Sequence, residues 1–579
     1  MASMPSARAA PDALARRGAR AQPAWRRPVR HHAACARVRR DARLGTCAYA
    51  SSSAPTARAS GAGGGGHLAV GGDARLSGLV RVGGAKNAVL ALLAGTLACA
   101  EPVTLTNVPD LRDVRSMIAV LESVGAKVTR LNESTGDART VSDVDGLGTL
   151  RVDCSRITSS AFTIDTVSKL RASFFAAGPM LARTGWVEMP LPGGCAIGAR
   201  PVDLHLRGFE ALGARVRITE KGTVIATTSA GSIGDDDDES FRSERGSSRA
   251  RPLRGARGGL ELRFPSVGAT HSLMTAAALA EGTTVIRGAA AEPEVADLAR
   301  MLNAAGADIR GAGTDTITVR GVGDGANAGS PRRGDAGARV AALGGCAHRA
   351  IPDRIEAGTF MVAAAVTRSQ IDLEPVILAH VRSTMDVLER FGCAFETREL
   401  SQTKNTTRRL DDEGRFLNDR HTSLNEVCLR VIPPTNRRDA RPFAFATAPF
   451  PGVPTDMQPQ LCVLASAASG ASTARETVFE SRVAHLEQLR AMGVDAGEEG
   501  DTIVIRGASS VTSTLNQKNL DEKNVDVYGS DLRATAALVL AGLCAKGTTR
   551  VFGLEHLDRG YERLDEKLRA LGADVDRRY

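Results

Sequence analysis

The 579-residue chain lacks any run of 18 uninterrupted apolar residues, so we expect no transmembrane helix. It also lacks a C-x-x-C pair, and its ten cysteines are scattered along the sequence. That pattern argues against a zinc site or a disulfide framework and favours a reducing compartment. A P-loop, a G-x-G-x-x-G turn after a strand and a metal-ligand cluster are missing as well. We therefore expect no cofactor and no metal.

The first 60 residues contain no lysine and only two acids, Asp12 and Asp41, but 12 arginines and many alanines and serines. This composition is typical of an organellar transit peptide, which we assign to residues 1–63 and expect to be disordered. A disordered basic arm that binds nucleic acid is the alternative. Beyond residue 60 the chain has 62 basic and 63 acidic residues. Because the folded part has no basic bias, we discount nucleic acid as a partner.

From Gly64 onward, a helix that ends in a glycine turn before a strand recurs six times. We expect the six glycines to adopt the left-handed conformation that ends a helix. Repetition at intervals of 79 to 101 residues is too long for a solenoid unit and indicates six copies of an α/β subdomain. The glycines are Gly125, Gly213, Gly306, Gly392, Gly493 and Gly572.

Each copy opens with an Ala/Leu-rich helix that is nearly free of charge. Because helices that are apolar on all faces belong in the interior, we expect them inside and the strands outside. Their N-terminal ends carry unpaired N–H groups, so several ends that converge would hold an anionic ligand. Asp456 and Asp531 at such ends have an alternative role as simple N-caps. The expected helices are 87–99, 171–183, 268–281, 358–367, 456–469 and 531–546.

Four segments between the copies are polar and lack apolar periodicity. We interpret them as insertions that form disordered surface loops. They lie near residues 231–258, 322–345, 400–425 and 507–527.

The stretch LPGGCAIGARPVDLH, residues 191–205, predicts a mobile loop that carries one thiol. Glycines on both sides of Cys195 let the backbone approach a ligand closely. Arg200 lies five residues further on, and a nearby cation helps a thiol to ionise. The alternative is an incidental cysteine on a surface loop.

Cations and carboxylates at the helix ends complete a candidate site around this thiol. Six cations imply a ligand with phosphate and carboxylate groups, which arginine binds bidentately. A thiol can donate a proton or act as a nucleophile, and a carboxylate can take a proton from a hydroxyl. The set predicts a metal-free transfer between two anionic small molecules. Its members are Cys195, Lys86, Arg171, Arg200, Arg482, Arg533, Arg559, Asp456 and Asp531.

Ten stretches, in order from about Leu68 to Arg577, resemble one family. They include GGAKNAVLALLAG, LPGGCAIGARPVDLH, PTDMQPQ and HLDRGYERLDEKLRALGADV. The chain resembles the UDP-N-acetylglucosamine enolpyruvyl transferases, which are UDP-N-acetylglucosamine 1-carboxyvinyltransferases. The resemblance implies a two-lobed inside-out α/β barrel built from six βαβαββ repeats. One lobe would span residues 86–351 with the cysteine loop, and the other 64–85 plus 352–579.

The resemblance also implies the reaction and its small-molecule substrates. The enolpyruvyl group of phosphoenolpyruvate would pass to the 3-hydroxyl of UDP-N-acetylglucosamine with release of phosphate, the first committed step of peptidoglycan precursor synthesis. Asp456 would deprotonate the hydroxyl, and Cys195 would protonate the methylene carbon of phosphoenolpyruvate, giving a tetrahedral intermediate that loses phosphate. Cys195 would then be the residue that an epoxide phosphonate such as fosfomycin alkylates. A plastid is favoured over a mitochondrion, because this pathway is more plausible there.

The other residue roles follow from the resemblance in the same way. Asp531, Arg482 and Arg533 would support charge and geometry. Phe264 occupies a position where some relatives carry lysine, and this departure leaves one nucleotide contact of the family without support here. Phosphoenolpyruvate would be bound by Lys86, Asn87, Arg200 and Arg559, and the UDP-sugar by Arg171, Arg200, Pro201, Val202, Asp203, Leu204, Ser266, Val267, Asp456 and Val478.

Two alternatives compete with this prediction. A 5-enolpyruvylshikimate-3-phosphate synthase would share the fold and phosphoenolpyruvate, but that family opens with a G-S-K-S-type run and has no GGC loop. GGAKN and Cys195 therefore argue against it. A catalytically silent relative would act as a UDP-sugar sensor or scaffold. The sequence leaves the oligomeric state open.

Overall fold

The computed structural model describes residues 66–131, 138–140, 148–192, 202–229, 251–256, 258–323, 341–400, 408–410, 416–417, 424–479, 481–507 and 524–579. The predicted transit peptide, Cys195, Arg200 and Pro201 lie outside these residues, as do most of the predicted insertions. None of the helices in the described part of the chain has the length and apolar character needed to cross a bilayer.

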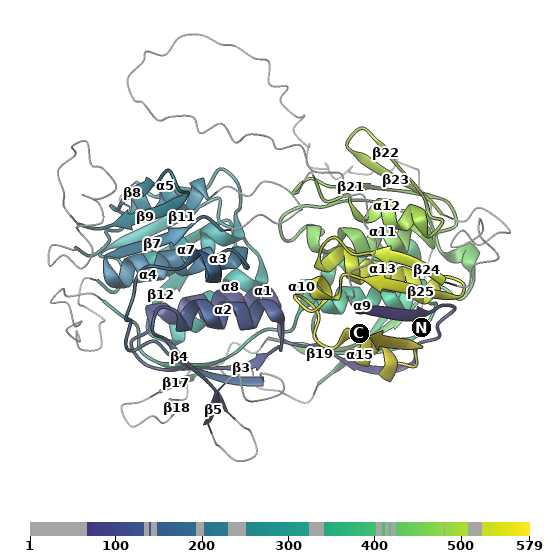
Figure 1. Cartoon of the computed structure of the whole chain (residues 1–579), viewed down its shortest axis with the longest axis horizontal. Coiled ribbons are helices and arrows are strands. Elements are labelled where there is room, and N and C mark those ends of the chain that lie inside the picture. Colours follow the sequence, from purple (N-terminus) through teal and green to yellow (C-terminus); the bar gives the residue numbers. More distant parts are fainter. Residues whose placement is uncertain are drawn as a thin grey trace, which may run out of the picture. The chain divides into compact units, whose positions relative to one another are not determined.

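Six sheets follow one plan (Figure 1). In the sheet that starts at β10 (Leu260–Glu261), the first strand is parallel to β11 (Thr283–Arg287), and a helix connects the two. A second helix leads to β12 (Asp308–Arg310) and then β13 (Thr316–Arg320), which lies antiparallel between β11 and β12. This order is βαβαββ, and the expected six repeats are confirmed.

Three of these units draw mainly on residues 86–351. In the unit with β7, an isolated parallel bridge between Ala161 and Glu188 takes the place of the first strand. The elements besides β10 to β13 are β14 (Cys346–Arg349), α1 (Lys86–Gly95), η1 (Thr96–Ala98), β3 (Val103–Val108), α2 (Arg112–Glu122), β4 (Lys127–Leu131), β5 (Ala138–Thr140), β6 (Gly148–Asp153), α3 (Ile164–Val167), η3 (Arg171–Ala176), α4 (Ala177–Thr184), β7 (Trp186–Pro190), α5 (Asp203–Ala211), β8 (Arg215–Ile218), β9 (Thr223–Thr227), α7 (Val267–Ala278) and α8 (Pro293–Ala304).

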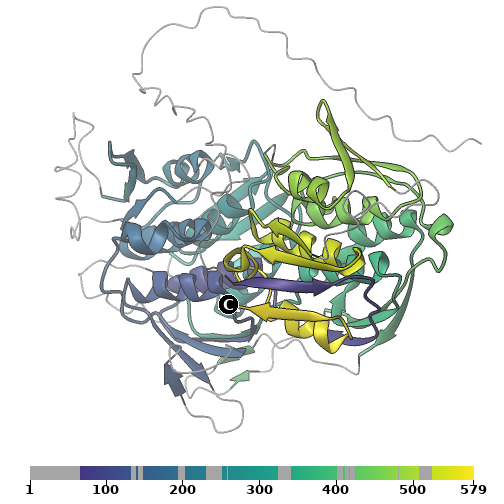
Figure 2. The ribbon, with the colours of Figure 1, turned by 45° about the vertical axis from the view of Figure 1, so that its right-hand side comes forward.

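The other three units draw on both ends of the chain. Figure 2 shows β1 (His67–Gly71) between β25 (Thr548–Phe552) and β26 (Val575–Arg578), with which it pairs antiparallel. The remaining elements are β2 (Gly78–Arg81), α9 (Arg354–Val366), β15 (Ile371–Ile377), α10 (Leu378–Phe391), β16 (Ala394–Glu399), β17 (Arg408–Leu410), β18 (Phe416–Leu417), β19 (Glu426–Ile432), η4 (Arg437–Asp439), β20 (Ala444–Ala446), η5 (Thr455–Met457), α11 (Gln458–Ser466), β21 (Ala471–Arg475), α12 (His485–Ala491), β22 (Asp495–Glu499), β23 (Thr502–Arg506), β24 (Asn524–Tyr528), α13 (Leu532–Cys544), α14 (Leu554–Leu557) and α15 (Leu564–Ala570).

The apolar helices lie in the interior, as the absence of a polar face predicts. All 13 residues of α9 and 12 of the 13 residues of α13 are buried. Helix α9 begins four residues before the expected start at Gly358, because the Asp353 side chain accepts hydrogen bonds from the N–H groups of Ile355 and Glu356 and caps the helix there.

The glycine turns have the expected backbone conformation. All six repeat glycines have positive φ, from +90° at Gly213 to +122° at Gly392. Side chains other than glycine are strained in this region, so the repeated glycine is a requirement of the turn.

Buried apolar side chains form two large clusters. One contains residues from Val89 to Ala350, and the other contains Leu68 to Val82 together with Ile355 to Val575. We therefore propose the division expected from the sequence, with a first lobe of residues 86–351 and a second lobe of residues 64–85 plus 352–579.

The chain passes between the two clusters in two neighbouring segments, residues 83–86 and 350–353. Hydrogen bonds join them from Ala85 N to Ile351 O (2.7 Å) and from Asp353 N to Gly83 O (2.8 Å), with an antiparallel bridge between Gly84 and Pro352. We call this pair of segments the connecting ribbon. It packs so closely on β3 that a Cβ at Gly84 would lie 1.8 Å from the Asn107 carbonyl oxygen.

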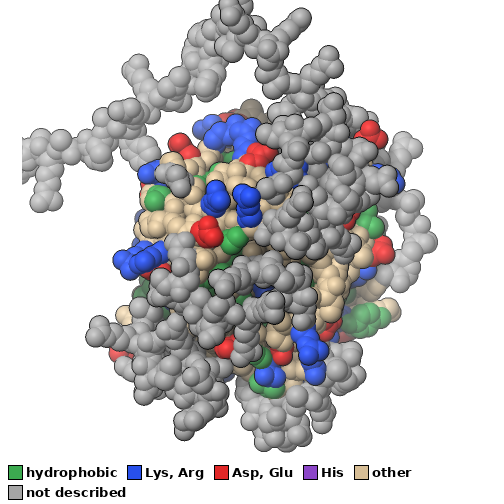
Figure 3. All heavy atoms as spheres, turned by 90° about the vertical axis from the view of Figure 1, so that its left-hand side faces the viewer, with side chains coloured by type: hydrophobic (Ala, Val, Ile, Leu, Met, Phe, Trp, Pro, Cys, Tyr) green, Lys and Arg blue, Asp and Glu red, His purple; other side chains and the backbone are tan. Residues whose placement is uncertain are grey.

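The ranges predicted for the insertions include residues that belong to the folded part of the chain. Strands β17 and β18, within residues 400–425, extend the sheet of β14, whose edge offers unpaired backbone groups. Leu253 and Ala256 are buried although they fall in the insertion predicted at 231–258. These apolar positions are too few to produce a periodic pattern. On the described part of the face in Figure 3, acidic and basic side chains lie next to one another, in keeping with the balanced charge.

Candidate active site

A cavity of ≈ 730 Å³ lies where the N-terminal ends of helices from both clusters meet. Its walls include Pro192 and Val202, which precede and follow Cys195 within the 191–205 stretch. The structure brings together thirteen of the predicted site residues in its lining: Lys86, Asn87, Arg171, Val202, Asp203, Leu204, Ser266, Val267, Asp456, Val478, Arg482, Asp531 and Arg559.

One carboxylate joins two of the predicted cations across the cavity. Asp113, in the first turn of α2, accepts hydrogen bonds from Lys86 Nζ (2.9 Å) and from Arg559 Nε (2.8 Å). Burial raises the pKa of Asp113, but the charges of Lys86 and Arg559 lower it by more than burial raises it. The pKa of Asp113 is therefore below its usual value. The ionised carboxylate holds the two cations together, and an incoming anion would compete with it for them.

Asp456 is held between two arginines. The carboxylate accepts one hydrogen bond from Arg482 Nη1 (3.0 Å) and another from Arg533 Nη2 (3.1 Å). Burial raises the pKa of Asp456, whereas Arg533 and then Arg482 lower it, and the balance lies well below the usual range. Arg533 is buried behind Asp456 and is not among the residues that line the cavity.

Asp456 and Asp531, for which a helix N-cap was the alternative to a role in the site, differ in what their side chains contact. Asp531 is the N-cap of α13 and accepts from the N–H groups of Arg533 (2.7 Å) and Ala534 (3.2 Å), although it also lines the cavity. Asp456 lies in η5 and caps no helix with its side chain. Its carboxylate therefore remains directed at the arginines.

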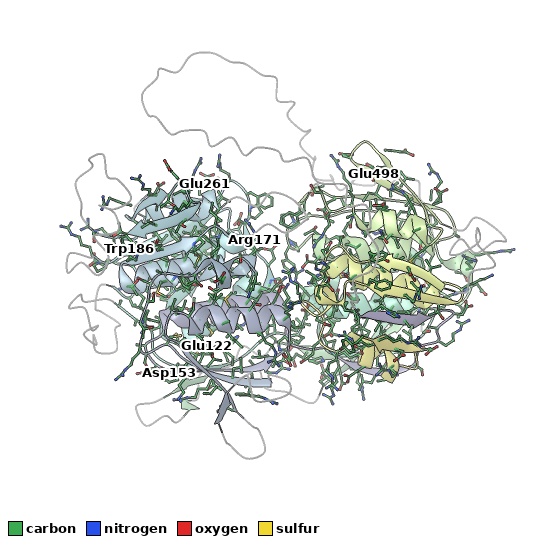
Figure 4. The ribbon with its side chains drawn as sticks, viewed as in Figure 1. Glu122, Asp153, Arg171, Trp186, Glu261 and Glu498 are labelled. Atoms are coloured by element: carbon green, nitrogen blue, oxygen red, sulfur yellow. The ribbon has the colours of Figure 1, made fainter. Side chains whose placement is uncertain are left out.

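The end of the cavity near α5 and α7 combines cations with neutral rings. Arg171, labelled in Figure 4, begins η3, and Arg263 donates to Asp203 over 3.0 Å. Burial lowers the pKa of His205 and of His271 to about 4, so both rings stay neutral at neutral pH. Phe264 and the neighbouring Arg263 also line the cavity.

Sequence reasoning missed three charged residues of the α8–α9 side. Arg354 donates to both Glu294 oxygens (3.0 and 3.4 Å), and Glu292 accepts from Phe450 N–H (3.2 Å). The glutamates lie in AEPEVADLA, residues 291–299, which is one of the ten stretches that resemble the family, but acids at a helix start usually serve the helix dipole alone. Asp113 was missed for the same reason, since it occupies the first turn of α2.

The comparisons with known proteins agree with the observed architecture. The profile of the family described as EPSP synthase (3-phosphoshikimate 1-carboxyvinyltransferase) matches residues 70–568. The solved enolpyruvyl transferase NikO from Streptomyces tendae has a TM-score of 0.65 at 22% identity and covers 89% of this chain and 99% of that chain. EPSP synthase from Acinetobacter baumannii has a TM-score of 0.57 at 17% identity, covering 89% and 100%. The enolpyruvyl transferase fold expected from the sequence is thereby confirmed.

Curated relatives are more similar in sequence. The UDP-N-acetylglucosamine 1-carboxyvinyltransferase of Gloeobacter violaceus is 41% identical over 511 residues, which cover 88% of this chain and 90% of the relative. UDP-N-acetylglucosamine 1-carboxyvinyltransferase 2 of Carboxydothermus hydrogenoformans is 40% identical over 506 residues, covering 87% and 98%.

Proposed function

Since the chain belongs to the enolpyruvyl transferase family of EPSP synthase, and within it to the UDP-N-acetylglucosamine 1-carboxyvinyltransferases, we propose that it transfers the enolpyruvyl group of phosphoenolpyruvate to the 3-hydroxyl of UDP-N-acetylglucosamine. Phosphate is the second product. The proposal rests on one observation. Two cations that bind the same carboxylate, Lys86 and Arg559, line one cavity together with Asp456, whose side chain does not cap a helix.

The cations suit phosphoenolpyruvate, which carries a phosphate and a carboxylate. Lys86 and Arg559 would bind it with Asn87 and with Arg200 from the cysteine loop, displacing the contacts to Asp113. Addition at the enol carbon develops positive charge there while the phosphate is held by cations. Fixed charged side chains in a site that excludes water therefore favour the step.

The remaining roles are distributed around the sugar. Asp456 would take the proton of the 3-hydroxyl, and Cys195 would give a proton to the methylene carbon. Arg482, Arg533 and Asp531 hold this arrangement in place. The UDP-sugar would be bound by Arg171, Val202, Asp203, Leu204, Ser266, Val267 and Val478, with Arg200 and Pro201 from the loop.

Phosphate release tests the proposal directly. The full-length chain is expected to release phosphate from phosphoenolpyruvate with UDP-N-acetylglucosamine and not with shikimate 3-phosphate. Preincubation with fosfomycin is expected to stop release and to add the mass of the inhibitor to Cys195, because a loop thiol near cations is readily ionised. Release with shikimate 3-phosphate would favour the sister activity, and silence with both would favour a UDP-sugar sensor.

We also propose a plastid location, set by residues 1–63. Several relatives are cyanobacterial, among them proteins of Gloeobacter violaceus and Prochlorococcus marinus, which is compatible with a plastid origin. A fluorescent protein fused after residues 1–65 should enter plastids, whereas a fusion to residues 66–579 should stay outside. Import into mitochondria would contradict the proposal.

A further inference from the structure

A tyrosine in the interior of the second lobe connects three of its central helices. Tyr561 is 2% exposed and lies between α14 and α15. Its hydroxyl lies 2.9 Å from Thr359 Oγ1 on α9 and 3.0 Å from Gln460 Nε2 on α11. The guanidinium carbon of Arg533 on α13 lies 5.2 Å from the centre of its ring.

The hydrogen bonds around this hydroxyl have a single consistent direction. Thr359 donates its proton to Ile355 O (2.8 Å), so its oxygen must accept from Tyr561. The Gln460 amide donates to both the Tyr561 and the Thr359 oxygens (3.0 and 3.2 Å). The two hydroxyls and Gln460 Nε2 therefore each have a partner, whereas Gln460 Oε1 has none among the described residues. The two contacts to its hydroxyl hold the phenol ring in place.

The ring in turn supports Arg533. This guanidinium donates to Asp456 through Nη2, while Nε and Nη1 have no hydrogen-bond partner among the described residues. A buried guanidinium over an aromatic face is attracted to it, most strongly where water is excluded. The orientation of Arg533 thus depends on two things, the Asp456 carboxylate and the Tyr561 ring.

We propose that Tyr561 is a positioning residue that holds Arg533 against Asp456 and thereby fixes the carboxylate that faces the substrate. The inference rests on the proposed function, in which Asp456 accepts the sugar proton. Tyr561 also follows Arg559 by two residues, so the same side chain anchors the segment that brings this cation to Asp113.

Two variants of the full-length chain separate the hydroxyl from the ring. Tyr561→Phe keeps the ring over Arg533 and is expected to lower kcat roughly tenfold, while Tyr561→Leu removes the ring and is expected to lower it roughly a hundredfold, since small displacements of catalytic groups cost this much. The KM values should change far less than kcat, because substrate contacts remain.

The pH profile gives the readout that a purely structural role would not move. Asp456 is faced by Arg482, Arg533 of α13, Lys86 of α1 and Arg354 of α9. Only Arg533 is disturbed by Tyr561→Leu, so the pKa of Asp456 should rise towards its usual value and the acid limb of kcat should move to higher pH. Tyr528→Phe on β24, an exposed tyrosine of the same lobe, is the matched control and should match wild type.

Unchanged kcat in both variants, or a loss of kcat without a shift of the acid limb in Tyr561→Leu, would overturn the inference. If Tyr561→Leu fails to fold, a crystal structure of Tyr561→Met, which also removes the ring, decides, because Arg533 Nη2 must then have moved away from Asp456. A wild-type chain without turnover would contradict the proposed function alone. The crystal structure of the variant would still test the positioning role.

Discussion

Replacing Asp456 by asparagine is expected to lower kcat by about 10² to 10⁴, the usual contribution of a general base. The amide keeps the shape of the side chain but cannot take a proton, and it leaves Arg482 and Arg533 without their carboxylate. Binding of UDP-N-acetylglucosamine, measured by calorimetry, should weaken only severalfold because most sugar contacts lie elsewhere in the cavity.

The pH dependence of the wild type follows from the same contacts. Because the pKa of Asp456 lies well below its usual range, the carboxylate stays ionised as the pH falls from 8 towards about 5. The rate should therefore not decline through protonation of this group in that interval.

Asp372→Asn provides a matched control for Asp456→Asn. Asp372 is also paired with an arginine, Arg430 (2.8 Å), but on strands outside the cavity. Equal losses in both variants would refute a catalytic role for Asp456.

Replacing Lys86 by methionine is expected to lower kcat/KM for phosphoenolpyruvate on the order of 10²- to 10³-fold, as for removal of one charge-stabilising donor from an active site. Methionine preserves the length of the side chain, so the loss reports the charge. KM for UDP-N-acetylglucosamine should change little, because the residues proposed for the nucleotide lie at the α5–α7 end. Steady-state phosphate release with each substrate varied in turn makes the measurement.

Lys567→Met is the control for this variant. Lys567 is likewise a mostly buried lysine on a buried carboxylate, with Nζ 2.6 Å from Glu356 Oε1, but it does not line the cavity. We expect it to lower the melting temperature and to leave kcat/KM unchanged. A Lys86→Met enzyme with the wild-type kcat/KM for phosphoenolpyruvate would remove Lys86 from the proposed site.

The features that could be predicted from the sequence are those set by local chemistry. A glycine between the end of a helix and a strand signals a left-handed turn, so Gly125 and its five counterparts were identified without any structure. The burial of α9 and α13 followed from their lack of a polar face. Asp456 was identified as a candidate because PTDMQPQ combines a resemblance with a carboxylate beside a helix start.

The features that escaped prediction depend on contacts between distant parts of the chain. Asp113 meets Arg559 across 446 residues, and Tyr561 meets Thr359 across 202. Neither residue differs in its local sequence from an ordinary helix-start acid or an ordinary buried aromatic. Only the convergence of three helices in the second lobe gives Tyr561 its position beside Arg533.

The connecting ribbon has a mechanical consequence. Two hydrogen-bonded segments that run in opposite directions resist sliding and twisting, because either motion would break the bonds of Ala85 and Asp353, whereas bending leaves those bonds intact. At the connecting ribbon itself, bending should therefore be easier than sliding or twisting. Lys86 is the last residue of one segment, and its N–H donates to Asp353 on the other (3.1 Å). The segment that bends thus also carries a proposed substrate-binding cation. Because the chain crosses between the lobes in two segments, proteolytic cleavage of one of them would leave the lobes covalently connected through the other.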